Sequence, residues 1–279
     1  MSKTALITGG ARGIGRCLVR RLLERNYKVH FLDIDEEELE HTTKTHLKEY
    51  YDAGKLQSAI SNLRDIQDIQ DKVKQTADFL GGRIHVLINN GGIASPRWKD
   101  GKTMADTSTI PEWQAYVETN LTSPFIVSQA CLPYMKQEKE SEAALHRDDD
   151  AGPCIILIGS FRALQSDANQ EGYAATKAGQ LGLTHSMAIS LQPWGIRVNL
   201  VAPGRIKVAH ECRDGDEKGL EWAEQNEEKE VDEHPTNRAS RPKDIADAVE
   251  YLVNAGFVTA QDLTVDGGGY EEEVDVGWS

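Results

Sequence analysis

The chain has 279 residues, with 31 Lys and Arg against 45 Asp and Glu, which gives a formal charge of −14. With an isoelectric point near 5.0, the protein is an unfavourable partner for nucleic acid and for anionic membrane surfaces, because like charges repel. No apolar run approaches the length of a membrane-spanning helix, and the first residues lack a secretory signal, so we expect a cytoplasmic protein.

Metal and disulfide sites are not expected. The four cysteines are widely spaced, without a C-x-x-C pair: Cys17, Cys131, Cys154 and Cys212. We interpret them as core or surface thiols. His41 and His46 are five residues apart, which puts them off a shared helical face, and no other residue set has metal-ligand spacing.

Short apolar runs alternate with longer amphipathic stretches along nearly the whole chain, which is typical of βαβ units. Seven strands are predicted, at 4–8, 28–33, 56–61, 85–89, 154–159, 197–201 and 262–265. The fifth is almost continuously apolar, as expected for a parallel strand covered on both faces. We therefore predict one α/β domain over 1–279, a Rossmann-type doubly wound parallel sheet with helices on both faces.

Two segments interrupt this pattern, at Lys136–Gly152 and Lys207–Glu233. From Glu211 to Glu233 there are 11 acidic residues and three basic ones. Such charge is most often a solvated surface. Because the second segment follows the sixth strand, where ligands of such sheets bind, we favour a substrate lid over 205–240.

The first predicted strand leads into a glycine-rich turn, Thr8–Gly15, and then a helix over about Arg16–Arg25. Without Cβ atoms, the backbone of such a turn can approach a pyrophosphate, which the helix N-terminus then holds. Asp33, at the end of the second strand, can hydrogen-bond the adenosine ribose and repels a 2′-phosphate, so NAD is favoured. Arg12 could accept that phosphate, so NADP is not excluded.

Four residues point to general acid-base chemistry. Tyr173 and Lys177 are four apart on one helix face, and a nearby ammonium is expected to lower the pKa of the phenol. Ser160, thirteen residues upstream at the end of the fifth strand, could bind a carbonyl oxygen beside the phenol. Asn120 lies on a helix whose local bend could turn its amide toward Lys177 through water.

With these motifs in this order, the sequence resembles the short-chain dehydrogenase/reductase family over about residues 3 to 268. The motifs that carry the resemblance are TGGARGIG, NNGG, Asn120, Ser160, YAATK, Pro203-Gly204, Arg197-Val198-Asn199, Arg241 to Ala246 and Val265 to Gly268. The family implies a catalytic tetrad of Asn120, Ser160, Tyr173 and Lys177. Together, the turn, the strand ends and the family predict these cofactor contacts: Gly9, Arg12, Gly13, Ile14, Gly15, Asp33, Asn62, Leu63, Asn90, Gly91, Tyr173, Lys177, Pro203, Gly204, Ile206 and Val208.

Three positions depart from the family pattern. Gly91-Gly92 stands where Ala-Gly is usual, and Asn62 replaces a common Asp beside adenine. Val208 replaces a Thr that bonds the nicotinamide amide in many members, so that contact must be weaker or come from the backbone.

The predicted reaction moves a hydride between nicotinamide C4 and an alcohol or carbonyl carbon. The segment Phe161–Gly172 should form a pocket wall with many polar groups: Arg162, Gln165, Ser166, Asp167, Asn169, Gln170 and Glu171. This wall and the acidic lid favour a neutral sugar, polyol or small ketone. An epimerase or dehydratase of the family's extended group and a non-catalytic dinucleotide sensor remain alternatives.

The family also implies a homodimer or homotetramer. The apolar stretch Leu181–Ala188 is a candidate interface or, equally, part of the core. For the tail from Glu271 to Trp278 we favour fraying over docking on a neighbouring subunit.

Overall fold

The computed structural model describes residues 2–136, 151–225, 231–232 and 234–269. Its strands form one sheet of seven in the order β3-β2-β1-β4-β5-β6-β7, and every adjacent pair is parallel. The strands are β1 (Thr4–Thr8), β2 (Lys28–Asp33), β3 (Leu56–Ile60), β4 (Val86–Asn89), β5 (Cys154–Ile158), β6 (Arg197–Pro203) and β7 (Asp262–Val265). The predicted doubly wound α/β fold is confirmed, with strand ends within two residues of those expected.

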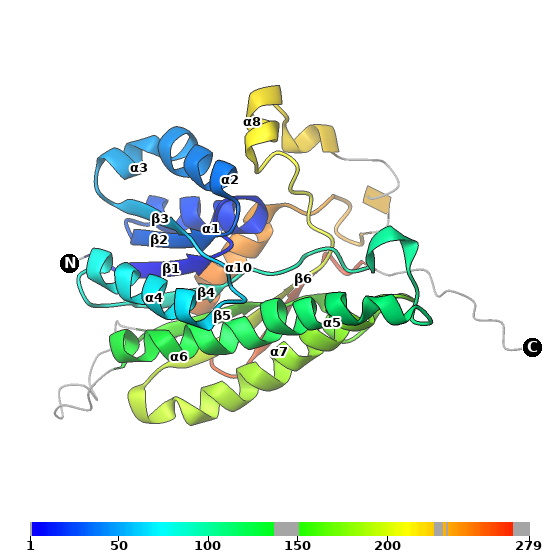
Figure 1. Cartoon of the computed structure of the whole chain (residues 1–279). Helices are drawn as coiled ribbons and strands as arrows, with labels where there is room; N and C mark the ends of the chain where they lie inside the picture. The colour runs from blue at the N-terminus through cyan, green and yellow to red at the C-terminus, as the bar shows by residue number, and fades with distance from the viewer. Residues whose placement is uncertain (1, 137–150, 226–230, 233, 270–279) are drawn as a thin grey trace, which may run out of the picture.

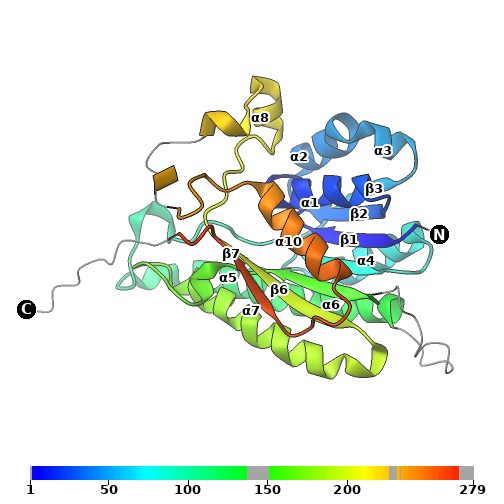
Figure 2. The ribbon, with the colours of Figure 1, turned by 180° about the vertical axis from the view of Figure 1, so that it is seen from behind.

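Helices cover both faces of the sheet (Figures 1 and 2). One face is covered by α1 (Gly13–Glu24) and α10 (Pro242–Asn254), and the other by α4 (Ile66–Leu80), α6 (Ser123–Met135) and α7 (Glu171–Ser190). The shorter helices are α2 (Glu36–His41), α3 (Lys48–Asp52), α5 (Ile110–Tyr116) and α8 (Arg213–Lys218), the π-helices η1 (Thr42–His46) and η4 (Val117–Thr122), and the 3-10 turns η2 (Lys99–Gly101), η3 (Thr107–Thr109), η6 (Phe161–Ala163), η7 (Gln192–Trp194) and η8 (Trp222–Gln225).

Each face has its own hydrophobic core. All five side chains of β5 are buried, because this central strand is covered from both sides. Alternate residues of the strands enter the two cores: Ile156 packs with α1 and α10, whereas Ile155 and Leu157 pack with α4, α6 and α7. The sheet is thereby fixed as a rigid platform whose strand ends hold the site.

The helix ends have local causes. α1 begins at Gly13, three residues before the predicted start, because the glycine-rich turn itself supplies the first helical turn. Asp65 caps α4 by accepting a hydrogen bond from the Asp68 N–H, and Gly81, at φ 81°, ends that helix in a left-handed conformation.

Several predictions concern surface segments. Most of the first interruption, the tail from Glu271 to Trp278, and residues 226–230 and 233 of the predicted lid lie outside the described residues. Part of the candidate interface stretch belongs to the core, because Thr184, Met187 and Ala188 are buried within the chain.

Cys17, Cys131 and Cys154 are buried free thiols, and Cys212 is partly exposed. No cluster of metal-ligating residues occurs within the described ranges. None of the helices in the described part of the chain is long and apolar enough to cross a membrane.

Candidate active site

The candidate site lies where the carboxyl ends of β1, β4, β5 and β6 meet at one edge of the sheet. Strand order reverses between β1 and β4, which leaves a crevice at that point. Thr8 connects the two strand ends, because its Oγ1 accepts hydrogen bonds from the N–H groups of Asn90 (3.1 Å) and Gly91 (2.9 Å). The predicted glycine turn and the predicted NNGG segment are therefore in direct contact.

The glycine-rich turn closes so tightly that it excludes side chains. A Cβ on Gly15 would lie 1.8 Å from the Gly9 carbonyl oxygen, and a Cβ on Gly9 would lie 2.6 Å from the Gly91 Cα. Asn90 holds the turn from β4, since its Nδ2 donates to the carbonyls of Thr8 (3.1 Å) and Gly9 (2.7 Å). The role of Asn90 here is to fasten the turn.

The N-terminus of α1 carries a backbone amide that has no acceptor among the described residues. The Gly13 N–H donates to the carbonyl of Glu211 at 2.7 Å. The N–H of Ile14 has no acceptor among the described residues, as expected in the first turn of a helix. A free amide at the positive end of a helix dipole fits a dinucleotide pyrophosphate.

At the end of β2, Asp33 supports the turn. Its Oδ2 accepts from the Ala11 N–H at 2.9 Å, and its Oδ1 accepts from the N–H groups of Ile34 (2.8 Å) and Asp35 (3.2 Å). Oδ1 therefore already accepts two backbone hydrogen bonds, whereas Oδ2 accepts one and retains a second lone pair. Arg12 is exposed on the turn nearby.

The loop at the end of β3, which is expected to contact the adenine, is held by a residue that the sequence analysis did not predict. Asp68, in the first turn of α4, accepts from the Ser61 hydroxyl (2.9 Å) and the Asn62 N–H (2.8 Å). The Asn62 side chain accepts from the Arg64 N–H at 3.1 Å and stabilises the loop. Leu63 lies against Gly91, where a Cβ would approach its Cδ1 to 2.6 Å.

Ser160, Tyr173 and Lys177 lie together beyond β5. Ser160 hydrogen-bonds the Tyr173 phenol and also accepts from the Arg162 N–H at 3.2 Å. The Lys177 Nζ lies 5.6 Å from the centre of the Tyr173 ring and donates to the Ile158 carbonyl at 2.8 Å. The predicted proximity of the phenol and the amine is thus present in the structure.

The lowered pKa predicted for the Tyr173 phenol is not found in the structure. Burial raises the pKa of Tyr173, although the Ser160 hydrogen bond and the Arg162 charge act in the opposite direction. Burial also lowers the pKa of Lys177 to about 8, which weakens the cation that was expected to acidify the phenol. The prediction was wrong because it counted the nearby charge and not the desolvation of both groups.

Asn120 occupies the π-helix η4, but its side-chain amide is bonded to Ile93 and not directed at Lys177. Its Oδ1 accepts from the Ile93 N–H at 2.8 Å, and its Nδ2 donates to the Ile93 carbonyl at 3.2 Å. The backbone carbonyl of Asn120 accepts from the Gln180 side chain at 2.5 Å. Gln180, 2% exposed on α7, was missed because its role depends on helix packing and not on a motif.

Aromatic side chains wall the site on one side. The Trp98 ring packs edge-on against Tyr116, and Tyr116 packs in the same way against Tyr173, with ring centroids 5.7 and 6.4 Å apart. Trp98 Nε1 donates to the Glu171 carboxylate at 2.8 Å. Gly172 allows the rings of Trp98 and Tyr116 to pack closely against its backbone, because a Cβ there would lie 2.7 Å from each of them.

The predicted polar wall divides into an exposed and a buried part. Gln165 and Ser166 are exposed, whereas Arg162 and Gln170 are buried. Arg162 Nη2 donates to Asp167 Oδ2 at 2.9 Å, and the Gln170 amide donates to the same oxygen at 3.1 Å. A charge-compensated polar cluster of Arg162, Asp167 and Gln170 therefore follows Ser160 in the chain.

Beyond β6, Gly204 donates its N–H to the Val265 carbonyl at 2.9 Å and has no room for a side chain against Asp266. Ile206 packs against the hydrophobic core between the sheet and helices α1 and α10. Val208 lies over the glycine-rich turn, because a Cβ added to Gly13 would be 3.8 Å from the Cβ of Val208. The segment that follows β6 thus reaches the glycine-rich turn.

Comparisons with known proteins agree with this geometry. A family model described as short chain dehydrogenase matches residues 3–218. An uncharacterized oxidoreductase of Thermotoga maritima is 31% identical over 276 residues, covering 95% of each chain. The 3-oxoacyl-(acyl-carrier-protein) reductase FabG of Vibrio cholerae is 33% identical over 270 residues, covering 96% of this chain and 97% of its own.

Solved structures are similar as well. An apo SCOR enzyme from Clostridium thermocellum superposes with a TM-score of 0.75 at 26% identity and covers 100% of this chain and 98% of that one. ElxO with NADP bound gives a TM-score of 0.75 at 26% identity and covers 96% and 98%.

Proposed function

Because the chain belongs to the short-chain dehydrogenase/reductase family of oxidoreductases, we propose that it interconverts an alcohol and a carbonyl compound with a bound NAD or NADP. The observation that carries the proposal is the hydrogen-bonded Ser160–Tyr173 pair over Lys177, at the same sheet edge as the free N–H of Ile14. The nicotinamide supplies or accepts the hydride when it is bound.

The residues of this chain handle the oxygen and the proton. In reduction, the Ser160 and Tyr173 hydroxyls bind the carbonyl oxygen, and Tyr173 donates its proton to that oxygen as negative charge develops on it. In oxidation, Tyr173 accepts the same proton from the substrate hydroxyl. Lys177, held by the Ile158 carbonyl, lies beside the phenol, where we propose that it holds the nicotinamide ribose, as the family resemblance implies.

Asn120 is proposed to act as a positioning residue. Its side-chain amide holds the backbone of Ile93 at both the N–H and the carbonyl, which fixes the loop after β4 beside the crevice. The loop follows Asn90 and Gly91, two of the predicted cofactor contacts, so we propose that Asn120 shapes this side of the crevice.

For the cofactor we propose NAD as the favoured form, because a 2′-phosphate would meet the carboxylate of Asp33. Arg12, exposed on the turn, and the NADP bound to ElxO support NADP as the second candidate. Titrating NADH and NADPH fluorescence with wild type, Asp33→Asn and Arg12→Gln separates them. If Asp33 discriminates, Asp33→Asn gains NADPH affinity; if Arg12 binds the phosphate, Arg12→Gln loses it.

For the substrate we propose a neutral, hydroxyl-bearing molecule such as a sugar, polyol or small ketone. Its support is that the Arg162 charge is already compensated by Asp167 and that the packed rings of Trp98 and Tyr116 border the phenol. The named activity of FabG makes a 3-oxoacyl thioester the natural competitor in the assay.

The test is turnover, followed by nicotinamide absorbance, of sorbitol, xylitol, glucose, diacetyl, a steroid alcohol and acetoacetyl-CoA. Turnover of the thioester alone would reject the neutral-substrate proposal and leave the reaction type intact. Dinucleotide binding without turnover of any compound would favour the sensor alternative. Light scattering of the same preparation tests the proposed homodimer or homotetramer.

A further inference from the structure

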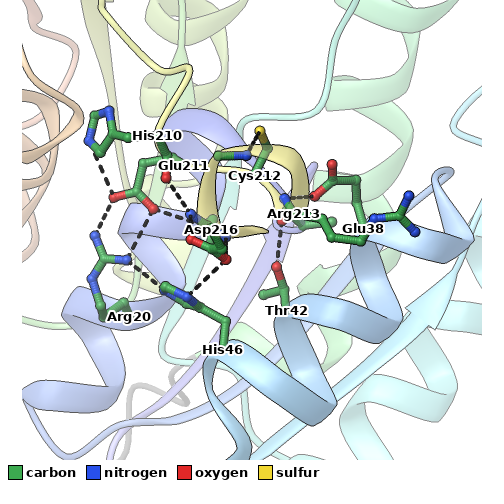
Figure 3. Close-up of polar contacts among 12 residues, drawn as sticks. Arg20, Glu38, Thr42, His46, His210, Glu211, Cys212, Arg213 and Asp216 are labelled. Carbon is green, nitrogen blue, oxygen red and sulfur yellow. Dashed lines mark hydrogen bonds and ion pairs between the residues drawn. The ribbon is translucent and has the colours of Figure 1, made fainter. Parts of the chain in front are cut away.

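After β6 the chain crosses to the opposite end of the cofactor crevice. We call Ile206–Gly219 the strap; it ends in α8, which lies beside α2 and η1 (Figure 3). The Arg213 N–H donates to the Glu38 carboxylate of α2 at 2.9 Å, and the Asp216 carboxylate lies 2.8 Å from His41 Nε2 and 3.3 Å from His46 Nδ1. These contacts therefore join residues that are 170 to 175 positions apart in the chain.

Arg16 of α1 is the centre of this attachment. It is fully buried, and all of its side-chain hydrogen bonds to described residues go to the strap. Nε donates to Glu211 (2.9 Å), Nη1 and Nη2 donate to the two oxygens of Asp216 (2.6 and 3.1 Å), and Nη2 also donates to the His210 carbonyl (2.8 Å). A buried guanidinium with partners on one segment binds that segment strongly.

The other charges around it complete a balanced set. Arg20, one turn further along α1, forms ion pairs with both oxygens of Glu211 and contacts the ring of His46. Burial opposes the ionisation of Glu211 and Asp216. It is outweighed by Arg20 and Arg16 at Glu211, and by Arg16, His41 and His46 at Asp216, so the pKa of each carboxyl is lowered. Two guanidinium groups thus face two carboxylates in a site largely shielded from water.

The attachment bears directly on the phosphate-binding turn. The Glu211 carbonyl accepts the Gly13 N–H at 2.7 Å, and Val208 covers Gly13. The next residue, Ile14, carries the free amide assigned above to a pyrophosphate. The strap is therefore one wall of the turn, and the carboxylate that anchors it is on the same residue as the carbonyl that contacts the turn.

We propose that Arg16, Arg20, Glu211 and Asp216 form a latch that holds the strap over the phosphate-binding turn, so that opening of the latch sets the rate of dinucleotide release. The four residues are positioning residues, since they act on the dinucleotide through the strap. The proposal rests on the dinucleotide binding proposed above.

The test is the rate at which bound NADH and NADPH leave the full-length protein, followed by stopped-flow fluorescence after mixing with excess oxidised dinucleotide. Asp216→Asn preserves shape and removes the charge that faces Arg16, His41 and His46. We expect release to accelerate by about tenfold or more, the scale of one lost charge-assisted hydrogen bond.

Arg21→Gln is the matched control. Arg21 lies on the same helix and forms ion pairs with Asp247 and Glu250 of α10, each at 2.7 Å. Its loss removes a comparable pair that does not touch the strap, so release should keep the wild-type rate.

A second readout follows the contact between the strap and the glycine-rich turn. Hydrogen exchange of the Gly13 amide should be faster in Asp216→Asn and in Glu211→Gln than in Arg21→Gln. Release at the wild-type rate in both latch variants, with folded protein, would overturn the latch alone. Absence of any dinucleotide binding by the wild type would overturn the proposed function and, with it, this inference.

Discussion

His30 gives the protein a specific sensitivity to acid. It lies in β2, is 1% exposed, and its Nδ1 is 3.0 Å from the Thr76 hydroxyl of α4. Burial, with a smaller contribution from the charge of Lys72, lowers the pKa of His30 from 6.5 to about 4. Protonation of His30 therefore places a charge in the buried layer between the sheet and α4, or it requires the chain to unfold.

The sign follows from proton binding. Between pH 6.5 and about 4 the unfolded chain has a protonated His30 and the folded chain does not, so the free energy of unfolding falls as the pH falls. The pKa difference, at 1.36 kcal/mol per pKa unit, corresponds to about 3 kcal/mol over that range. This is a large part of the stability of an ordinary domain.

Urea unfolding at a series of pH values between 7 and 4, on wild type and His30→Gln, measures the effect. Glutamine offers Thr76 a hydrogen-bond partner and does not titrate, so the difference between the two proteins removes the contribution of the other acidic groups. We expect that difference to change by about 3 kcal/mol in favour of the variant on acidification. Parallel stability curves would refute the reasoning.

The remaining predictions concern the site. Tyr173→Phe should lower kcat at least about a hundredfold with little change in the dinucleotide Kd, and near-normal turnover would contradict its role as acid and base. Gly15→Ala should abolish dinucleotide binding, because its Cβ would meet the Gly9 carbonyl, whereas Gly182→Ala, in an open position of α7, should bind normally in the same fluorescence titration. Because burial raises the pKa of Tyr173, the rate of alcohol oxidation should rise with pH above neutrality, whereas carbonyl reduction should not; an oxidation rate that is flat in a pH profile would contradict this.

The sequence predicts the sheet well because buried parallel strands need nearly continuous apolar runs, and the run at Cys154–Ile158 meets that requirement locally. The helix α1 starts earlier than its amphipathic pattern indicates, because glycines carry no apolar signal. The presence of a helix and the ends of the strands can thus be predicted from the sequence, whereas the first residue of a helix that begins within a glycine-rich turn cannot.

The contacts that could not be predicted depend on distant parts of the chain. Arg16 and Glu211 are 195 residues apart in sequence, and no local pattern marks them as partners. The burial of Tyr173 and Lys177 likewise arises only when α7 packs on the sheet, which is why the direction of the phenol pKa was misjudged. Site chemistry set by desolvation is a property of the folded chain.

The π-helix Val117–Thr122 constrains how this chain can evolve. A single wide turn accommodates one residue more than an α-helix would, and it frees the Asn120 carbonyl for Gln180. Deleting one residue there would convert the wide turn into a regular α-helical turn, in which the Asn120 carbonyl returns to the helix and its contact with Gln180 is lost. Between Tyr116 and Ser123, therefore, the number of residues should be under stricter selection than most of their identities.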